Sequence, residues 1–157
     1  IRQAEAFIRA LHAQRRKVVG ICFGHQLIAQ ALGGVVDKSS NGWGVGIQEY
    51  QLLYSPEQGR DLVRLVASHQ DQVMHTPPGA EITARNAHCP IAGFRIDNHI
   101  LTFQGHPEFI PEYAREIIGF RRPMIGEARA DEGLVTLATR EQEGPWVAQW
   151  ILDFFRG

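Results

Sequence analysis

The sequence has few of the features that mark secreted, membrane-bound or nucleic-acid-binding proteins. Its 157 residues include two cysteines, so there is no disulfide framework and we expect a reducing, cytoplasmic compartment. No run of about 18 apolar residues is present, so we expect no membrane-spanning helix. There is also no signal-peptide pattern at the start. The net charge of −1 argues against nucleic acid or an anionic membrane as the main partner.

Internal repeats, low-complexity segments and a phosphate-binding loop are also missing. The glycine-rich stretch 41–44 does not have the G-x-x-x-x-G-K-[ST] order. The chain begins with Ile1 rather than methionine, and apolar residues follow a helical period from the first positions. We therefore expect residues 1–157 to form a single domain whose N-terminal part, including at least one strand, is incomplete.

The most informative stretch joins an apolar run to a helical pattern through a cysteine. Val18–Ile21 has the length and β-branched content of a buried parallel strand. Cys22 follows, with Gly20 and Gly24 two positions to either side, which is the spacing of a nucleophile elbow with cysteine in place of serine. The start of the following helix favours a thiolate. The alternative is that Cys22 is a small buried apolar residue.

A second motif follows another apolar run. Residues 100–104 are predicted to form a strand that runs directly into Gly105-His106-Pro107-Glu108. Because active sites of such sheets lie at the carboxyl ends of the strands, we expect Cys22 and His106 to meet there. Glu108 can then hold the imidazole in its useful tautomer.

Metal binding is the alternative for these side chains. Cysteine and histidine are zinc ligands, but the spacing of Cys22, His25, Cys89 and His106 matches no known type of zinc site. We therefore expect no metal and no cofactor, and interpret Cys89 as a structural residue.

The rest of the chain predicts alternating strands and helices. Strands are expected at 18–21, 45–54, 62–67, 80–85, 91–96 and 100–104, and helices at 1–16, after Cys22, at 111–122 and at 145–155. Pro123 is expected to end the third helix. Residues 37–44 and 68–73 are predicted to be a loop and a turn, and 124–144 are unassigned. This mixture predicts a three-layer α/β sandwich with a mostly parallel central sheet.

These residues carry a resemblance to a known family. Gly20–Gln26 together with Gly105–Glu108 resembles the class I glutamine amidotransferase domain, of the cysteine–histidine–glutamate type. Ser68–Val73 matches a third element of that family. His88–Phe94 and Gln104–Phe109 are similar to its stand-alone branch, which is related to the amidotransferase domain of GMP synthase. The resemblance covers nearly the whole chain and implies a flavodoxin-like fold.

The resemblance also implies an activity. Cys22 would attack the side-chain amide carbon of glutamine, His106 would act first as base and then as acid, and Glu108 would orient His106. Water would release the γ-glutamyl thioester as glutamate, and the ammonia would pass to an unknown acceptor. The residues implied to bind the substrate are Phe23, through its backbone N–H, and Gln26, Ser68, Gln70 and Asp71.

Two other functions stay open. The first is a γ-glutamyl peptidase, which would use the same three residues on γ-glutamyl peptides or glutathione-like adducts. The second is a binding or regulatory homologue without catalysis. In the enzymatic hypotheses the partner is a small molecule, either glutamine or a γ-glutamyl compound. A synthetase or other acceptor partner stays unidentified, and neither nucleic acid nor a membrane is expected.

Overall fold

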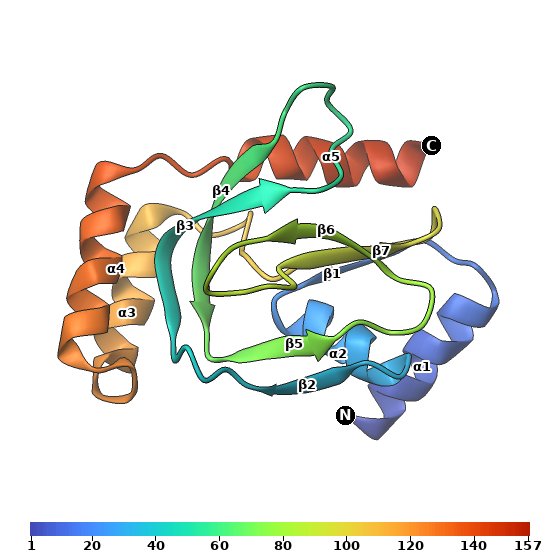
Figure 1. Cartoon of the computed structure of the whole chain (residues 1–157), viewed down its shortest axis with the longest axis horizontal. Coiled ribbons are helices and arrows are strands. Elements are labelled where there is room, and N and C mark those ends of the chain that lie inside the picture. The colour runs from blue at the N-terminus through green and yellow to red at the C-terminus, as the bar shows by residue number, and fades with distance from the viewer.

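The computed structural model describes all residues from 1 to 157, folded into five helices and eight strands (Figure 1). The helices are α1 (Arg2–Ala13), α2 (Phe23–Ala31), α3 (Pro111–Ile125), α4 (Glu127–Thr139) and α5 (Gly144–Arg156). The strands are β1 (Val18–Ile21), β2 (Val35–Lys38), β3 (Gly44–Leu52), β4 (Leu62–His69), β5 (Asp71–His75), β6 (Glu81–Arg85), β7 (Gly93–Ile96) and β8 (Ile100–Phe103).

Six of the strands form the central sheet, in the order β1-β8-β7-β6-β3-β4, and β2 pairs with β5 in a separate ribbon. Only β1 and β8 run parallel, and the other pairings are antiparallel. The sheet of this chain is therefore mixed, where the sequence predicts a mostly parallel one. The reason lies in the connections: β7 and β8 are joined by three residues, which allows only an antiparallel hairpin.

Helices cover both faces of the central sheet, which gives the predicted three-layer α/β arrangement. Strand β8 shows the alternation, since Ile100 packs toward α1 and α2 while Leu101 packs toward α5. Trp150 of α5 belongs to the same cluster as Leu101. Helices α3 and α4 pack on β3 and β4, through a cluster that includes Ile118. In Figure 1, α5 lies above the sheet and α1 and α2 lie below it.

Three local predictions differ from the structure. The predicted loop at 37–44 contains the end of β2, and the predicted turn at 68–73 contains the end of β4 and the start of β5. Helix α3 continues through Pro123 to Ile125, because a proline in the last turn removes only one internal hydrogen bond. The unassigned segment contains α4, whose buried residues are mostly small: Ala130, Gly133 and Leu137.

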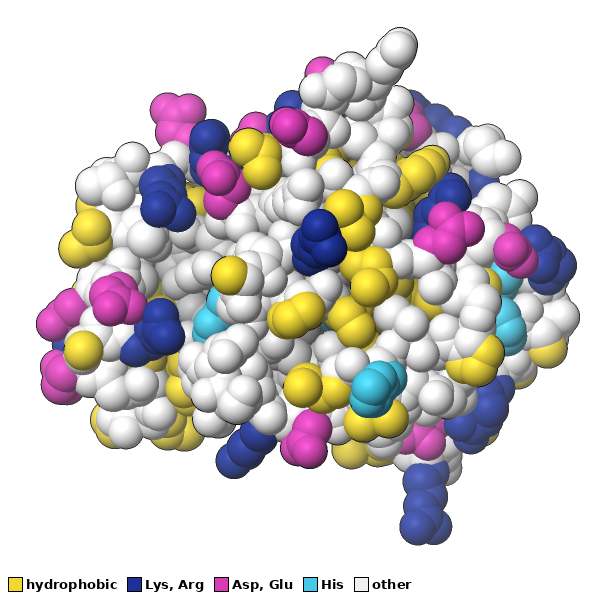
Figure 2. All heavy atoms as spheres, in the orientation of Figure 1, with side chains coloured by type: hydrophobic (Ala, Val, Ile, Leu, Met, Phe, Trp, Pro, Cys, Tyr) yellow, Lys and Arg dark blue, Asp and Glu magenta, His cyan; other side chains and the backbone are white.

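Charged side chains of both signs are interspersed on the face drawn in Figure 2, without a large area of one sign. None of the five helices combines the length and the apolar character needed to cross a bilayer.

Candidate active site

Cys22 lies in a strained turn between β1 and α2. Its backbone has φ 49° and ψ −101°, a left-handed conformation that a non-glycine residue adopts only when its surroundings enforce it. A Cβ atom on Gly20 would lie 2.6 Å from Cδ1 of Ile28 and 2.7 Å from the backbone of Gly24. The close passage of strand and helix therefore requires glycine at position 20. A Cβ on Gly24 would meet no atom within 4 Å, so position 24 does not require it.

The N-terminus of α2 is directed at Cys22, which is the N-cap residue of this helix. No side chain caps the first turn, so the N–H groups at this end remain open to a ligand. The positive end of the helix dipole favours an anion at the same place. Phe23 contributes the first of these N–H groups, and its side chain is 60% exposed.

His106 is held by a strand edge and an aromatic ring. Its backbone N–H donates to the carbonyl oxygen of Val66 in β4 over 2.8 Å. The imidazole stacks on Phe109, with ring centroids 3.9 Å apart and an interplanar angle of 14°. Nδ1 lies 2.7 Å from Oε1 of Glu108, so Nε2 is the nitrogen left free to act on the side chain of Cys22.

The charges of this group follow from these contacts. Burial by itself lowers the pKa of His106, but its interactions with Cys22 and with Glu108 outweigh this effect and raise the pKa to about 9. Burial raises the pKa of Glu108, and its hydrogen bond with His106 reverses this, so that the net shift is downward. At neutral pH the pair is therefore an imidazolium and a carboxylate.

Gln104 also contacts Cys22, and the sequence analysis did not single it out. It is fully buried at the end of β8, and its Nε2 lies 3.6 Å from Sγ of Cys22. Its Oε1 accepts from Nε2 of Gln26 over 3.2 Å, and that nitrogen also donates to the carbonyl oxygen of Asp71 over 2.8 Å. The one available signal was a buried amide directly before the histidine motif, because buried polar groups require partners.

The predicted substrate-binding residues lie at two places. Phe23 and Gln26 are in the first turn of α2, and the others lie at the end of β4, at the connection that follows it and at the start of β5. Gln26 links the two places through Asp71. The carbonyl oxygen of Gln70 accepts from the N–H of Ser39 over 3.1 Å. The hydroxyl oxygen of Ser68 accepts from Arg121 over 3.0 Å, so this buried side chain has a partner within the protein.

His25 and Cys89, the other candidate metal ligands, are buried inside the protein. His25 is fully buried, and its ring nitrogens lie 2.8 Å from the hydroxyl oxygen of Thr102 and 3.2 Å from the carbonyl oxygen of Ile91. Burial lowers its pKa to about 3. Cys89 lies in the core, where burial raises its pKa to about 12. Nowhere do three histidine, cysteine, aspartate or glutamate side chains converge so that they could hold a metal ion.

Known proteins are similar to this chain in sequence and in fold. The family described as glutamine amidotransferase class-I matches residues 1–122. Gamma-glutamyl peptidase 2 from Arabidopsis thaliana is 30% identical over 116 residues, which are 70% of this chain and 47% of that protein. The GMP synthase (glutamine-hydrolyzing) of Aeropyrum pernix is 32% identical over 119 residues, which are 73% of this chain and 23% of the synthase. The crystal structure of a glutamine amido transferase from Methylobacillus flagellatus has a TM-score of 0.76 and 26% identity, over 98% of this chain and 68% of that one.

The family match extends over more than half of the sequence, so this chain belongs to the class I glutamine amidotransferases. This confirms the resemblance and, at the level of the family, the prediction of a glutamine amidotransferase-type amide hydrolase. The similarity to solved amidotransferases confirms the α/β fold. The chain spans about half the length of the peptidase to which it is similar.

Proposed function

We propose that Cys22, His106 and Glu108 hydrolyse the side-chain amide of glutamine. The Cys22 thiolate attacks the amide carbon, the C–N bond breaks, and ammonia leaves with the proton of the His106 imidazolium. The product on the protein is a γ-glutamyl thioester. Neutral His106 then takes a proton from water, which attacks the thioester and releases glutamate and the Cys22 sulfur. Glu108 keeps Nδ1 protonated throughout.

The observation that carries this proposal is that Cys22 and the hydrogen-bonded pair of His106 and Glu108 follow two paired parallel strands. The three side chains come from two segments that are 84 residues apart, since Cys22 follows β1 and His106 follows β8. β1 and β8 are parallel neighbours in register, with Ile21 opposite Phe103. Both segments therefore leave the sheet at the same edge, which is where such sheets carry their active sites.

We also propose roles for the five residues around the triad. The N–H of Phe23 donates to the oxyanion that forms when the amide carbon is attacked, as the position after an elbow nucleophile does. Gln26 contacts the bound glutamine. Ser68, Gln70 and Asp71, at the turn between β4 and β5, hold its amino-acid end, largely through the main chain.

Release of glutamate tests the proposal. The full-length protein and its Cys22→Ala variant are incubated with glutamine, and glutamate and ammonia are both quantified. We expect equal amounts of the two products from the protein and none above background from the variant, because no other group can form the thioester. Circular dichroism of both proteins controls for folding. Glutamate release that survives Cys22→Ala in a folded variant would exclude this mechanism.

A γ-glutamyl peptidase is the second candidate, supported by the similarity to gamma-glutamyl peptidase 2. The same chemistry then breaks a γ-glutamyl peptide bond, and an amino acid or peptide leaves in place of ammonia. A γ-glutamyl dipeptide in the same assay separates the two substrates. Release from glutamine alone supports the amidotransferase, and release from the dipeptide alone supports the peptidase.

The setting of the reaction is part of the proposal. The thiol of Cys22 is free, and we place the protein in a reducing compartment such as the cytoplasm, where thiols stay reduced. We propose residues 1–157 as one glutaminase domain. The acceptor of its ammonia, or a synthetase partner that carries one, would be found by adding candidate acceptors and following loss of free ammonia.

A further inference from the structure

The outer edge of β4 holds two segments of the chain side by side. β4 is an edge strand, so its outward backbone groups have no strand partner on that side. Glu143 is the hydrogen-bond partner of both backbone groups of Arg64. The N–H of Glu143 donates to the Arg64 carbonyl oxygen over 2.8 Å, and Oε2 of Glu143 accepts from the Arg64 N–H over 2.9 Å. Two residues further on, Val66 pairs with His106. The same strand edge therefore positions the catalytic histidine and Glu143.

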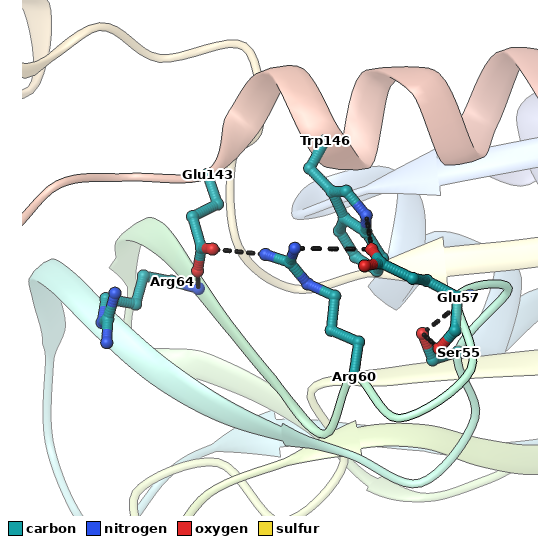
Figure 3. Close-up of polar contacts among 6 residues, drawn as sticks. All are labelled: Ser55, Glu57, Arg60, Arg64, Glu143 and Trp146. Carbon is teal, nitrogen blue, oxygen red and sulfur yellow. Dashed lines mark hydrogen bonds and ion pairs between the residues drawn. The ribbon is translucent and has the colours of Figure 1, made fainter.

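A cluster of charged and aromatic side chains fixes Glu143 from the other side (Figure 3). The Arg60 guanidinium forms ion pairs with Glu143 and with Glu57, the latter at 3.5 Å. It also lies 4.0 Å from the ring centroid of Trp146, and Nε1 of Trp146 donates to Oε2 of Glu57 over 2.7 Å. This clamp, made of Glu57, Arg60, Glu143 and Trp146, ties the connection between β3 and β4 to the start of α5.

Next to Glu143, the chain packs closely against the turn that carries His106 and Glu108. A Cβ atom on Gly144 would lie 2.1 Å from the carbonyl oxygen of Pro107 and 3.0 Å from its carbonyl carbon. Pro107 stands between the two triad members of this turn. Gln142 donates from Nε2 to the carbonyl oxygen of Phe109, whose ring stacks on His106. Residues 142–144 therefore contact the turn both before and after Glu108.

We propose that Gln142, Glu143 and Gly144 are positioning residues, which hold the turn 106–109 so that the His106 imidazole meets Cys22 and Glu108 at once. They act through the backbone of Pro107 and Phe109 and touch none of the reacting atoms. The clamp keeps them in place. This inference rests on the proposed function of the triad. The three positioning residues, 142–144, lie beyond the segment 1–122 that matches the family.

The arrangement predicts which kinetic constant depends on these residues. The residues proposed to bind the substrate lie on α2 and around the turn between β4 and β5, and their hydrogen bonds go to residues other than 142–144. A displacement of the turn 106–109 changes the alignment of His106 with Cys22, on which the chemical step depends. It leaves the substrate-binding residues in place. A defect in positioning should therefore lower kcat and leave KM nearly unchanged.

Gly144→Ala tests the inference, with Gly119→Ala as the matched control. The added methyl at 144 must displace the backbone of Pro107, whereas a methyl at 119 in α3 meets no atom within 4 Å. We expect kcat of Gly144→Ala to fall about 10- to 100-fold, with KM within about threefold, since a displacement of about 1 Å has effects of this size. NMR titration of His106 should show its pKa falling from about 9 toward its ordinary value. Gly119→Ala should change neither.

Gln142→Ala extends the test to a variant without a steric clash. It removes the hydrogen bond to Phe109, and we expect a smaller fall in kcat and a pKa shift in the same direction. If both variants fold and both keep the parental kcat and His106 titration, the inference is wrong. The same holds if Gly144→Ala does not fold and Gln142→Ala matches the parent. The NMR titration needs no substrate, so it separates failure of this inference from failure of the proposed function, which Cys22→Ala tests.

Discussion

Cys22 and His106 occupy the same candidate site, but they are supported in different ways. The turn of Cys22 is formed within one continuous segment, β1 followed by α2, and the close contact that shapes it lies between Gly20 and residues up to eight positions away. His106 depends on distant partners: Val66 in β4, the ring of Phe109, and residues 142–144 before and at the start of α5. One half of the site is built from local sequence and the other from tertiary contacts.

Because of this difference, mutations elsewhere in the chain should affect Cys22 and His106 differently. The turn at Cys22 is shaped mainly by its own segment, since strand, turn and helix are contiguous, and its distant contacts come from one neighbour, β8 and the Gln104 that follows it. His106 can be displaced from three directions, including an element that follows it by nearly forty residues. We call Cys22 with β1 and α2 the nucleophile half of the site, and His106 with its turn 106–109 the histidine half. Mutations in the nucleophile half are therefore expected to change mainly the stability of the β1–α2 unit. Mutations in the histidine half are expected to change mainly the catalytic rate.

The largest effect on the histidine half should come from Glu108→Gln. The amide keeps the size of the side chain but loses the charge that stabilises the imidazolium. We expect kcat for glutamate release to fall by about 10²–10⁴, by analogy with the loss of the acid from a serine-protease triad. The pKa of His106, about 9 with Glu108 ionised, should fall in the variant, as NMR titration would show.

The same pair makes stability depend on pH, with a definite sign. His106 has a higher pKa in the folded protein than its ordinary value of 6.5, so the folded state binds more protons between 6.5 and about 9. Its contribution to stability is complete below pH 6.5 and is lost as the pH rises through about 9. Urea denaturation at pH 6.5 and 9.5 should show a smaller loss of stability for Glu108→Gln than for the parent. Equal losses would mean that Glu108 does not stabilise the imidazolium.

Much of the nucleophile half could be predicted from the sequence, because its signals are local. The apolar run of β1, the glycine spacing around Cys22 and the period of α2 all fall within one stretch. β2 and β5 were missed because they form a mostly polar ribbon without clear alternation. α4 was missed because its buried face consists mainly of small residues. No local pattern indicates that Gly144 meets Pro107, since only the edge of β4 brings those segments together.

A pair of glycine variants sharpens the local side of the comparison. In Gly20→Ala the new methyl would overlap Ile28 and the backbone of Gly24, whereas in Gly24→Ala it meets no atom within 4 Å. We expect Gly20→Ala to lower the free energy of unfolding by about 1–3 kcal/mol, the usual range for overpacking. Gly24→Ala should be neutral or up to about 1 kcal/mol more stable, since alanine is the better helix former. Urea denaturation of both variants decides this, and similar losses at the two positions would contradict it.

The smallest effect is expected at Gln104, the residue that joins the two halves. Its Nε2 lies 3.6 Å from Sγ of Cys22, a long hydrogen bond, so its removal should cost less than the range of about 1.5–3 kcal/mol for bonds to charged groups. Gln104→Leu should therefore slow alkylation of Cys22 by iodoacetamide at pH 7 by less than about tenfold, with a similar fall in kcat. Gln104→Glu keeps an acceptor for Gln26 but places a carboxylate beside the sulfur. If repulsion of the thiolate is what matters there, this variant should be slower than Gln104→Leu at pH 7. If both variants react as fast as the parent, Gln104 acts by filling space rather than through its amide.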